Sequence, residues 1–418
     1  MDLYLEIKTQ EQNEKNFVDR TSSHIRNILH GFFLSVGTTV AEPLTVLPMI
    51  IAYFSGSHFL VGVYTSLLKG GAILVQMIAA FYAQSYPKMM PYMRIVFFFR
   101  FISWFSIGLI IYFFGEFNST LTLWGIGIGL FVFSFSSGFG AIYFKEIQAK
   151  VFSHSFRGKT MAYRQFFSNL GAILSGTATG FILEAFEPPY SFAYLFIISA
   201  FIIGLGLLAF ATIDEPIKTK ITQKEKSFRQ FLKNSFSLLK HDPQLNYQVF
   251  GYLLSYSYLF AVPFIILDAK EKIELSGSIL GLFITLQMTG AMLSNLVWGK
   301  LSANKKNREI VYISTFLVVL SLTLIIFFHN IYIYGLVFFI LGGSMDGFRL
   351  SFGNLILIIA PEDKRPVYVA LSATISSVGL FFPIIGGALL NYINYNLLYV
   401  LTILMLSLGI FFSHKIKE

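Results

Sequence analysis

The segment GTTVAEPLTVLPMIIAYF, residues 37–54, is an apolar stretch that carries a carboxylate, Glu42. About 20 predominantly apolar residues are enough for an α-helix to span the hydrocarbon core of a bilayer. Glu42 is followed by Pro43, which cannot donate a hydrogen bond to the carbonyl of Thr39. A helix usually kinks at such a position. The segment therefore predicts a bent transmembrane helix with an ionisable group beside the bend.

The rest of the chain has the composition of a polytopic membrane protein. Of its 418 residues, 55% are hydrophobic and only 13% are charged, so it carries more apolar surface than a soluble domain can bury. Polar breaks and turn residues divide it into twelve apolar spans. Their centres lie near residues 40, 70, 103, 135, 172, 202, 257, 290, 318, 346, 378 and 404.

The distribution of Lys and Arg predicts the orientation of the spans. An even number of spans places both termini on one side, and the loops of that side hold most of the basic residues. The only basic residues in the opposite loops are Lys270 and Lys272. By the positive-inside rule, both termini are cytoplasmic, as expected for a protein of the cytoplasmic (inner) membrane. The net charge of +9 is then a signal of orientation, and we expect no nucleic-acid partner.

The longest polar loop separates the spans into two groups of six. Within it, the sequence SFRQFLKNSFSLLK, residues 227–240, places its apolar side chains on one helical face and its basic side chains opposite. This pattern favours a helix lying in the membrane interface over a helix that binds a partner protein. The expected units are a cytoplasmic segment at 1–26, a six-helix bundle at 27–213, a linker at 214–244, a second six-helix bundle at 245–414 and a cytoplasmic tail at 415–418.

The two groups of spans resemble each other in sequence. Residues 47–51 (LPMII) in span 1 recur as residues 262–266 (VPFII) in span 7. Matches in other corresponding spans are Gly138-Phe139 with Gly347-Phe348, and Arg157, Ala162, Ser168 and Gly171 with Arg365, Ala370, Ser376 and Gly379. Repeated matches at a near-constant offset indicate a duplicated six-helix unit. Such parallel repeats usually enclose a binding site at their interface, near the bilayer midplane.

Two further motifs carry a resemblance to a known family. The loop GKLSANKKNR, residues 299–308, is similar to the cytoplasmic loop signature of the major facilitator superfamily, with Ala303 at the position that is usually acidic. SFSSGFGA, residues 134–141, is similar to that superfamily's Arg-x-x-Gln-Gly-x-Gly-Ala pattern, with Ser134 in place of the arginine. The resemblance extends over residues 27–414.

The resemblance implies an all-α membrane fold of twelve transmembrane helices in two pseudo-symmetric six-helix bundles. It also implies that spans 1, 4, 7 and 10 line a central cavity and that the two bundles rock about it to give alternating access. In such a protein the helix bends at Pro43, Pro48 and Pro263 are expected to act in gating. The loop signature, with Gly299 and Arg308, is expected to latch the cytoplasmic gate.

Ionisable residues within the spans are the main candidates for function, because a charge at the centre of a spanning helix costs about 2.5–3.5 kcal/mol on insertion scales. Glu42, Lys69, Asp346 and Arg349 lie near mid-depth, and the last two share a helix face. We expect these four to bind substrate and expect Glu42 and Asp346 to carry the coupled proton. The alternative is that Glu42 pairs with Lys69, and Asp346 with Arg349, as structural ion pairs. Charges nearer the cytoplasmic surface are expected to be structural, namely Arg100, Lys145 and Glu146.

Aromatic and amide side chains complete the predicted substrate site. The segment GYLLSYSYLF, residues 251–260, places Tyr252 and Tyr256 on one stripe, where they can offer hydroxyls and ring faces to a substrate. Packing between helices or anchoring at the interface explains tyrosines in so aromatic a protein about as well. Weaker candidates for the site are Tyr143, Gln287 and Asn354.

The sequence favours a transporter over an enzyme or a metal protein. It has no cysteine and no histidine pattern with metal-ligand spacing. No nucleophile constellation or phosphate-binding loop stands out, so we expect no cofactor and no catalytic site. The leading hypothesis is a monomeric, proton-coupled secondary transporter of a small organic solute that is amphipathic or charged. The alternatives are a lipid or lysolipid flippase and a transporter-like sensor that binds without translocating.

Overall fold

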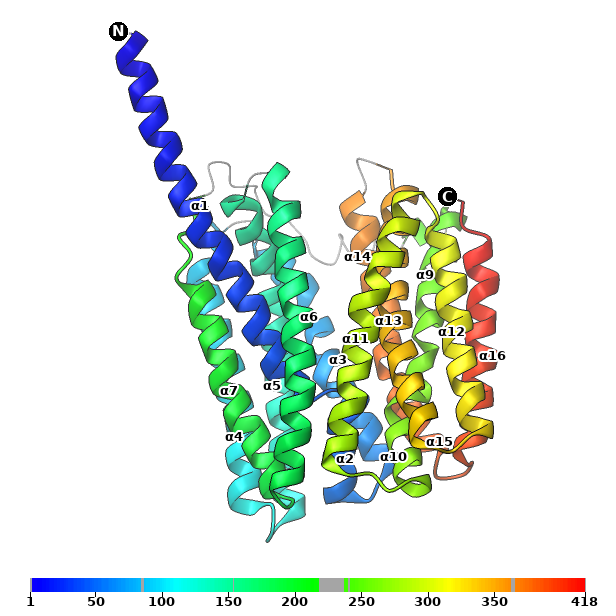
Figure 1. Ribbon diagram of the computed structural model, residues 1–418. Helices are drawn as coiled ribbons and strands as arrows, with labels where there is room; N and C mark the ends of the chain where they lie inside the picture. Colours follow the sequence, from blue (N-terminus) through cyan, green and yellow to red (C-terminus); the bar gives the residue numbers. More distant parts are fainter. Residues whose placement is uncertain are drawn as a thin grey trace.

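The computed structural model describes residues 2–83, 86–152, 154–217, 237–239, 241–361 and 365–417. Figure 1 shows two helical bundles side by side, with the two chain termini at the same end. We call this the terminal end and the opposite one the far end. The N-terminal bundle comprises α1 (Asp2–Thr39), α2 (Val46–Ser55), α3 (His58–Ala83), α4 (Met90–Phe114), α5 (Ser119–Val151), α6 (His154–Ala185) and α7 (Tyr190–Ala211).

The C-terminal bundle begins after the linker. It comprises α9 (Pro243–Ser255), the short 3-10 helix η1 (Tyr256–Phe260), α10 (Val262–Lys272), α11 (Gly277–Ala303), α12 (Asn307–Phe327), α13 (Ile331–Ile359), α14 (Arg365–Ser376), η2 (Ser377–Phe381), α15 (Phe382–Leu389) and α16 (Tyr395–His414). The interfacial helix predicted at 227–240 falls largely outside the described residues.

The described helices confirm an integral membrane protein. Ten helical segments are long and apolar enough to cross a membrane, and α2 is a shorter apolar helix. The end of α1 together with α2, and α3, pack beside these segments. The arrangement is consistent with the twelve predicted spans in two bundles.

The predicted bend at Pro43 is a complete break in the first span. The helix α1 ends at Thr39 and α2 begins at Val46, so Glu42 and Pro43 lie in the connection between them. Turn hydrogen bonds replace the helical ones there: the Glu42 amide donates to the Thr39 carbonyl at 3.1 Å, and the Leu47 amide donates to the Glu42 carbonyl at 3.1 Å. The break frees the backbone around Glu42 from regular helical hydrogen bonding.

The seventh span is interrupted at the corresponding place in the repeat. There η1 separates α9 from α10. Pro48 and Pro263 stand in the first turns of α2 and α10, where a missing backbone N–H costs no intrahelical hydrogen bond. The two prolines that we predicted to bend the outer parts of the spans therefore begin new helices after the breaks.

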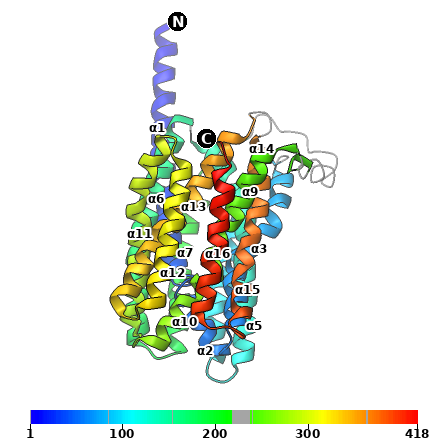
Figure 2. The ribbon, with the colours of Figure 1, turned by 90° about the vertical axis from the view of Figure 1, so that its right-hand side faces the viewer.

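Two seams join the bundles. Helix α6 packs on α11, and α3 packs on α15, as the side view in Figure 2 shows. In the first seam, a Cβ atom built on Gly281 would lie 2.6 Å from the Cα of Gly180. In the second, a Cβ atom on Gly62 would lie 2.1 Å from the carbonyl oxygen of Pro383. Glycines at these positions let the backbones of the two bundles touch.

At the terminal end of the N-terminal bundle, Glu215 caps α4. This carboxylate is 2% exposed and accepts hydrogen bonds from the backbone amides of Met89, at 2.9 and 2.8 Å, and of Met90, at 2.6 Å. It also forms an ion pair with Lys150 at 2.6 Å. A negative charge at a helix N-terminus is favourable because the free N–H groups there point at it. Glu215 therefore ties α4, α5 and the segment after α7 together.

We expect the Glu215→Ala variant to be strongly destabilised. Removing one partner of a buried ion pair leaves an uncompensated charge, at Lys150 here, and typically costs about 3–5 kcal/mol. The free energy of unfolding, measured by denaturant titration of the purified protein in detergent, should fall accordingly. Glu187→Ala, which removes an exposed carboxylate, is the control. An equal midpoint for both variants would contradict this role of Glu215.

Candidate substrate-binding site

A cavity of about 300 Å³ lies between the bundles. Its lining includes Lys69, Asp346, Arg349 and the two tyrosines expected to bind substrate, but Glu42 is not part of it. The N-terminal bundle contributes Lys69 from α3. The C-terminal bundle contributes Tyr252, Ser255, Tyr256, Tyr258, Leu259, Met345, Asp346, Phe348, Arg349 and Leu380.

Asp346 and Arg349 form an ion pair one helical turn apart on α13. A guanidinium nitrogen of Arg349 lies 2.9 Å from one oxygen of Asp346, and the other oxygen accepts a hydrogen bond from Asn295 Nδ2 at 2.8 Å. The side chain of Arg349 is 63% exposed and that of Asp346 is 18% exposed. The carboxylate is thus engaged on both oxygens, whereas most of the guanidinium faces open space.

Close packing of α13 against α11 places this pair. A Cβ atom on Gly342 would lie 1.9 Å from the carbonyl oxygen of Gln287, and one on Gly347 would lie 3.2 Å from the ring of Trp298. Trp298 also donates from its ring nitrogen to the Gly343 carbonyl at 2.9 Å. The neighbouring helix α11 therefore occupies the space beside these glycines.

Lys69 is an exposed cation on the cavity wall. In the part of the chain that the structure describes, no carboxylate lies within ion-pair distance of its ammonium group. This includes the carboxylate of Glu42. Glu42 and Lys69 therefore do not form the structural ion pair that was the alternative interpretation of the sequence. Lys69 stays within electrostatic range of Glu42.

Glu42 bonds instead to the opposite bundle. Gln287 on α11 donates from Nε2 to Glu42 Oε1 at 3.2 Å. Gln287 is 3% exposed, and its side-chain oxygen Oε1 has no hydrogen-bond partner among the described residues. One hydrogen bond at mid-depth thus connects the broken first span to the C-terminal bundle. Gln287 itself was only a weak candidate in the sequence.

The tyrosines form a stacked aromatic wall on the C-terminal side of the cavity. The rings of Tyr252 and Tyr256 stack with centroids 5.2 Å apart, and Tyr256 donates to the Tyr252 hydroxyl at 3.4 Å. Phe352 stacks on the other side of Tyr252 at 4.8 Å. Tyr258 lies parallel to Phe348 at 6.0 Å. The break at η1 turns Tyr256 and Tyr258 toward the same space.

Two other predicted site residues lie elsewhere. Tyr143 belongs to an aromatic cluster on α5 and α4, with its ring 6.1 Å from that of Tyr92. Asn354 donates to Ser302 Oγ at 2.7 Å and to Asn307 Oδ1 at 3.3 Å, near the terminal end of the C-terminal bundle. Both side chains satisfy contacts within their own bundle.

The loop-signature residues and the remaining charges also act within one bundle. Arg308 donates to the Ile416 carbonyl at 3.1 Å, which ties the loop to the end of the chain. Gly299 has open space where a Cβ atom would lie. Arg100 is 9% exposed, with its guanidinium 4.6 Å from the centre of the Phe133 ring. Lys145 is exposed and Glu146 is half-buried.

At the far end, polar contacts hold the bundles together. His58 Nε2 lies 2.8 Å from the hydroxyl of Tyr395, which donates to Glu271 Oε1 at 3.2 Å. Glu184 at the end of α6 accepts from the amide and the hydroxyl of Ser278, at 3.0 and 3.1 Å. Figure 1 shows α2 reaching toward α10 at this end. These contacts close the interface between the bundles on the far side of the cavity.

Sequence reasoning missed Asp268 in α10, which is fully buried. It accepts hydrogen bonds from the hydroxyls of Tyr334, at 3.1 Å, and Tyr399, at 3.0 Å. Lys272, one turn along the same helix, pairs with it at 2.9 Å. The Asp-x-x-x-Lys spacing could have revealed the pair. Its partners all come from the C-terminal bundle, so it stabilises that bundle.

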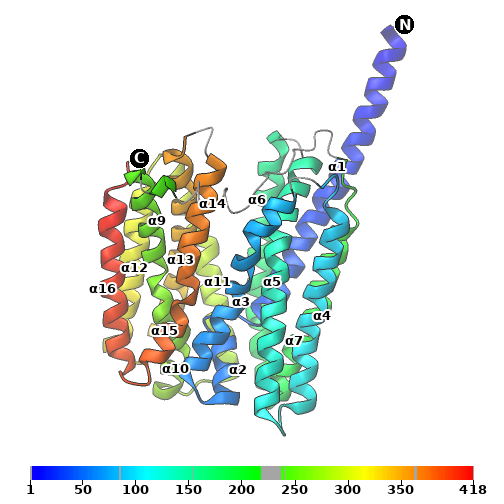
Figure 3. The same cartoon turned by 180° about the vertical axis from the view of Figure 1, so that it is seen from behind.

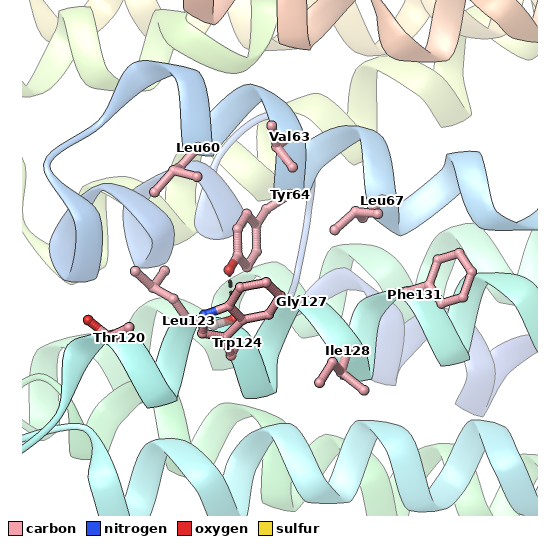
Figure 4. Close-up of a pocket in the computed structure, with 10 residues that line it drawn as sticks. All are labelled: Leu60, Val63, Tyr64, Leu67, Thr120, Leu123, Trp124, Gly127, Ile128 and Phe131. Atoms are coloured by element: carbon pink, nitrogen blue, oxygen red, sulfur yellow. Dashed lines mark hydrogen bonds between the residues drawn. The ribbon is translucent and has the colours of Figure 1, made fainter.

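A larger groove of about 540 Å³ lies between α3 and α5, and Figure 4 shows its lining. The side chains are almost all apolar, and the one phenol, Tyr64, already donates to the Leu123 carbonyl at 2.7 Å. Trp124 at its edge is 68% exposed. Such a lining suits contact with lipid chains and offers no charge to a polar solute.

A family model matches the C-terminal part of the chain. Residues 248–416 match the model of the Major Facilitator Superfamily. The match covers fewer than half of the 418 residues. The fold class predicted from the sequence is confirmed.

Solved structures of transporters share this fold over nearly the whole chain. A mutant of the nucleoside transporter NupG superposes with a TM-score of 0.75 at 12% identity, covering 95% of this chain and 100% of that one. A D-xylose-proton symporter gives 0.69 at 14% identity, covering 96% and 98%. The inward open xylose transporter XylE from E. coli gives 0.66 at 15% identity, covering 96% of each chain. No curated protein sequence matches the chain.

Proposed function

We propose that this protein belongs to the major facilitator superfamily and is a secondary active transporter that moves a small organic solute by proton-coupled alternating access. The observation that carries the proposal is the cavity at the bundle interface, with Lys69 on one side and Asp346, Arg349 and the tyrosines on the other. A solute held between two bundles is exposed to one side or the other as the bundles rock. Because the sequence has no nucleotide-binding motif, an ion gradient is the expected source of energy.

The orientation follows from the positive-inside rule. The terminal end is then cytoplasmic, and the protein resides in the cytoplasmic membrane. The hydrogen bonds of Glu184 and Tyr395 close the interface at the far end, which becomes the outer side. The described conformation therefore corresponds to a carrier closed to the outside.

The proton site that we propose is Glu42, because its hydrogen bond to Gln287 crosses between the bundles. A carboxylate in that position changes charge on protonation, and the contact with the opposite bundle changes with it. Asp346 is the weaker candidate, since Arg349 and Asn295 engage both of its oxygens.

Alternating access can be tested by distances between engineered cysteines, because the natural chain has none. One pair, Phe117→Cys with Tyr392→Cys, reports on the far end. A second pair, Lys159→Cys with Asn304→Cys, reports on the terminal end. All four residues are exposed. Spin-label distances in nanodiscs should show the far-end pair separating as the terminal-end pair approaches.

The Glu184→Ala change should shift this equilibrium toward the outward-open form. The carboxylate holds the N-terminus of α11 through Ser278, and these hydrogen bonds exist only while the far end is closed. We expect a several-fold rise in the population with a long far-end distance and a matching rise in short terminal-end distances. Glu187→Ala is the control. Distances that stay fixed in the variant and under an imposed pH gradient would refute alternating access.

A further inference from the structure

The charges that remain free in the cavity are positive. Both oxygens of Asp346 are engaged, by Arg349 and by Asn295. Glu42 accepts its hydrogen bond from Gln287. By contrast, Lys69 has no hydrogen bond or ion pair in the described part of the chain, and Arg349 uses one nitrogen on Asp346 while its side chain stays 63% exposed. The carboxylate in the cavity lining is that of Asp346, so a bound solute meets two cations and a carboxylate whose oxygens are both engaged.

The rest of the lining sets the shape of that solute. Leu259, Met345, Phe348 and Leu380 surround the cavity with apolar surface, and the stacked tyrosines add ring faces and hydroxyls. A space of about 300 Å³ lies at the small end of ligand pockets, which run from about 300 to 1,000 Å³. It suits a compact body with one charged end and is too small to enclose a long acyl chain.

We propose that the substrate is a small organic anion with a compact apolar or aromatic body, bound at its charged end between Lys69 and Arg349 and accompanied by one proton on Glu42. This assignment rests on the proposed transport function and names the substrate class of the same site. It rests on one arrangement in the cavity: the carboxylate of Asp346 is hydrogen-bonded on both oxygens, whereas Lys69 and Arg349 remain exposed.

The charge balance explains why the anion and the proton would move together. Gln287 on α11 donates to Glu42, and Lys69 on α3 lies within electrostatic range of it. Tyr258 on η1 lies within electrostatic range of Glu42 and also of Asp346 and Arg349. With Glu42 ionised, the net charge of Lys69, Arg349, Glu42 and Asp346 is zero. With Glu42 protonated the set is positive by one charge, which a monovalent anion cancels. Only the empty ionised form and the fully loaded form are neutral, and a carrier with an excess charge in its site is costly to reorient within the membrane.

Binding to the purified full chain tests the sign of the substrate charge. Three probes share one body and differ in charge: phenylacetate, 2-phenylethanol and 2-phenylethylamine. Titration calorimetry in detergent at acidic and neutral pH should show binding of phenylacetate, tighter at acidic pH, and weaker or no binding of the other two. Stronger binding of the amine or the alcohol, or binding of none of the three, overturns the inference.

Variants of Lys69 locate the binding. Lys69→Gln should weaken phenylacetate about tenfold, the scale of one lost hydrogen bond to a charged group, and Lys69→Arg should restore much of the affinity. Lys145→Gln, a lysine outside the cavity, is the matched control for fold and net charge. Equal affinity in Lys69→Gln and Lys145→Gln overturns the site. Lysophosphatidate, an anion with a long acyl chain, tests the size limit, and its binding in preference to phenylacetate overturns the compact substrate.

Transport is measured in a separate experiment, so that the transport function and the anionic substrate class can be refuted independently. Proteoliposomes containing the wild-type chain receive labelled phenylacetate or 2-phenylethylamine under an inward proton gradient. Binding of the anion without uptake leaves the anion site standing and refutes transport. Uptake of the amine in place of the anion supports transport and overturns the anion site. Uptake of phenylacetate that is independent of membrane potential supports both.

Discussion

Proteoliposomes containing the Glu42→Gln variant should exchange substrate across the membrane but should no longer accumulate it against its gradient. Glutamine is nearly isosteric with glutamate and can still contact Gln287, which lies 3.2 Å from Glu42 in the wild type. It cannot take up a proton. A carrier that couples one proton to each anion can accumulate substrate about tenfold per pH unit of gradient, because one pH unit is worth about 1.4 kcal/mol per proton. The variant should lose this tenfold accumulation per pH unit entirely.

The pH dependence has a definite sign. If Glu42 must be protonated in the loaded carrier, wild-type uptake rises as the pH on the uptake side falls, and the Glu42→Gln rate is flat over the same range. Labelled phenylacetate uptake and counterflow, measured side by side, separate coupling from binding. Glu187→Gln is the control for loss of a carboxylate. Proton-driven accumulation that survives in Glu42→Gln would exclude Glu42 as the proton site.

The sequence predicted the features of the fold that depend on strong local signals. Pro43 cannot complete a helical hydrogen bond, and the first span breaks beside it. The LPMII and VPFII repeats begin new helices after equivalent breaks. Lys69, Asp346 and Arg349 stood out because charges are costly at mid-depth in a membrane, and the structure places all three on one cavity.

The sequence could not tell which helix face each side chain occupies. In a membrane protein, both the buried face and the lipid face of a helix are apolar, so periodicity says little about orientation. Tyr143 and Asn354 were therefore expected near the substrate, although they contact residues of their own bundle. The hydrogen bond between Glu42 and Gln287 joins α11 to the first span over 245 positions of sequence, and no local pattern encodes it.

Replacing Gly62 by valine should hold the carrier open on the far side and reduce uptake by at least about tenfold. A Cβ atom on Gly62 would lie 2.1 Å from the carbonyl oxygen of Pro383, and one on Gly387 would lie 2.3 Å from the carbonyl oxygen of His58. This seam between α3 and α15, seen from behind in Figure 3, is thus a contact of backbone with backbone across the bundles. Rigid backbone has no rotamer by which to make room for a side chain, so the bundles themselves must part.

The far-end label pair at Phe117 and Tyr392 should then report a long distance, and the terminal-end pair a short one. Gly353→Val is the matched control, because a Cβ atom there meets no neighbour within 4 Å. Denaturant titration of both variants shows whether each bundle remains folded. A folded Gly62→Val protein that keeps the wild-type distances and uptake would mean that this seam does not close the far end. If the distances shift as expected, the glycine contact between α3 and α15 is what lets the two bundles close at the far end of the cavity.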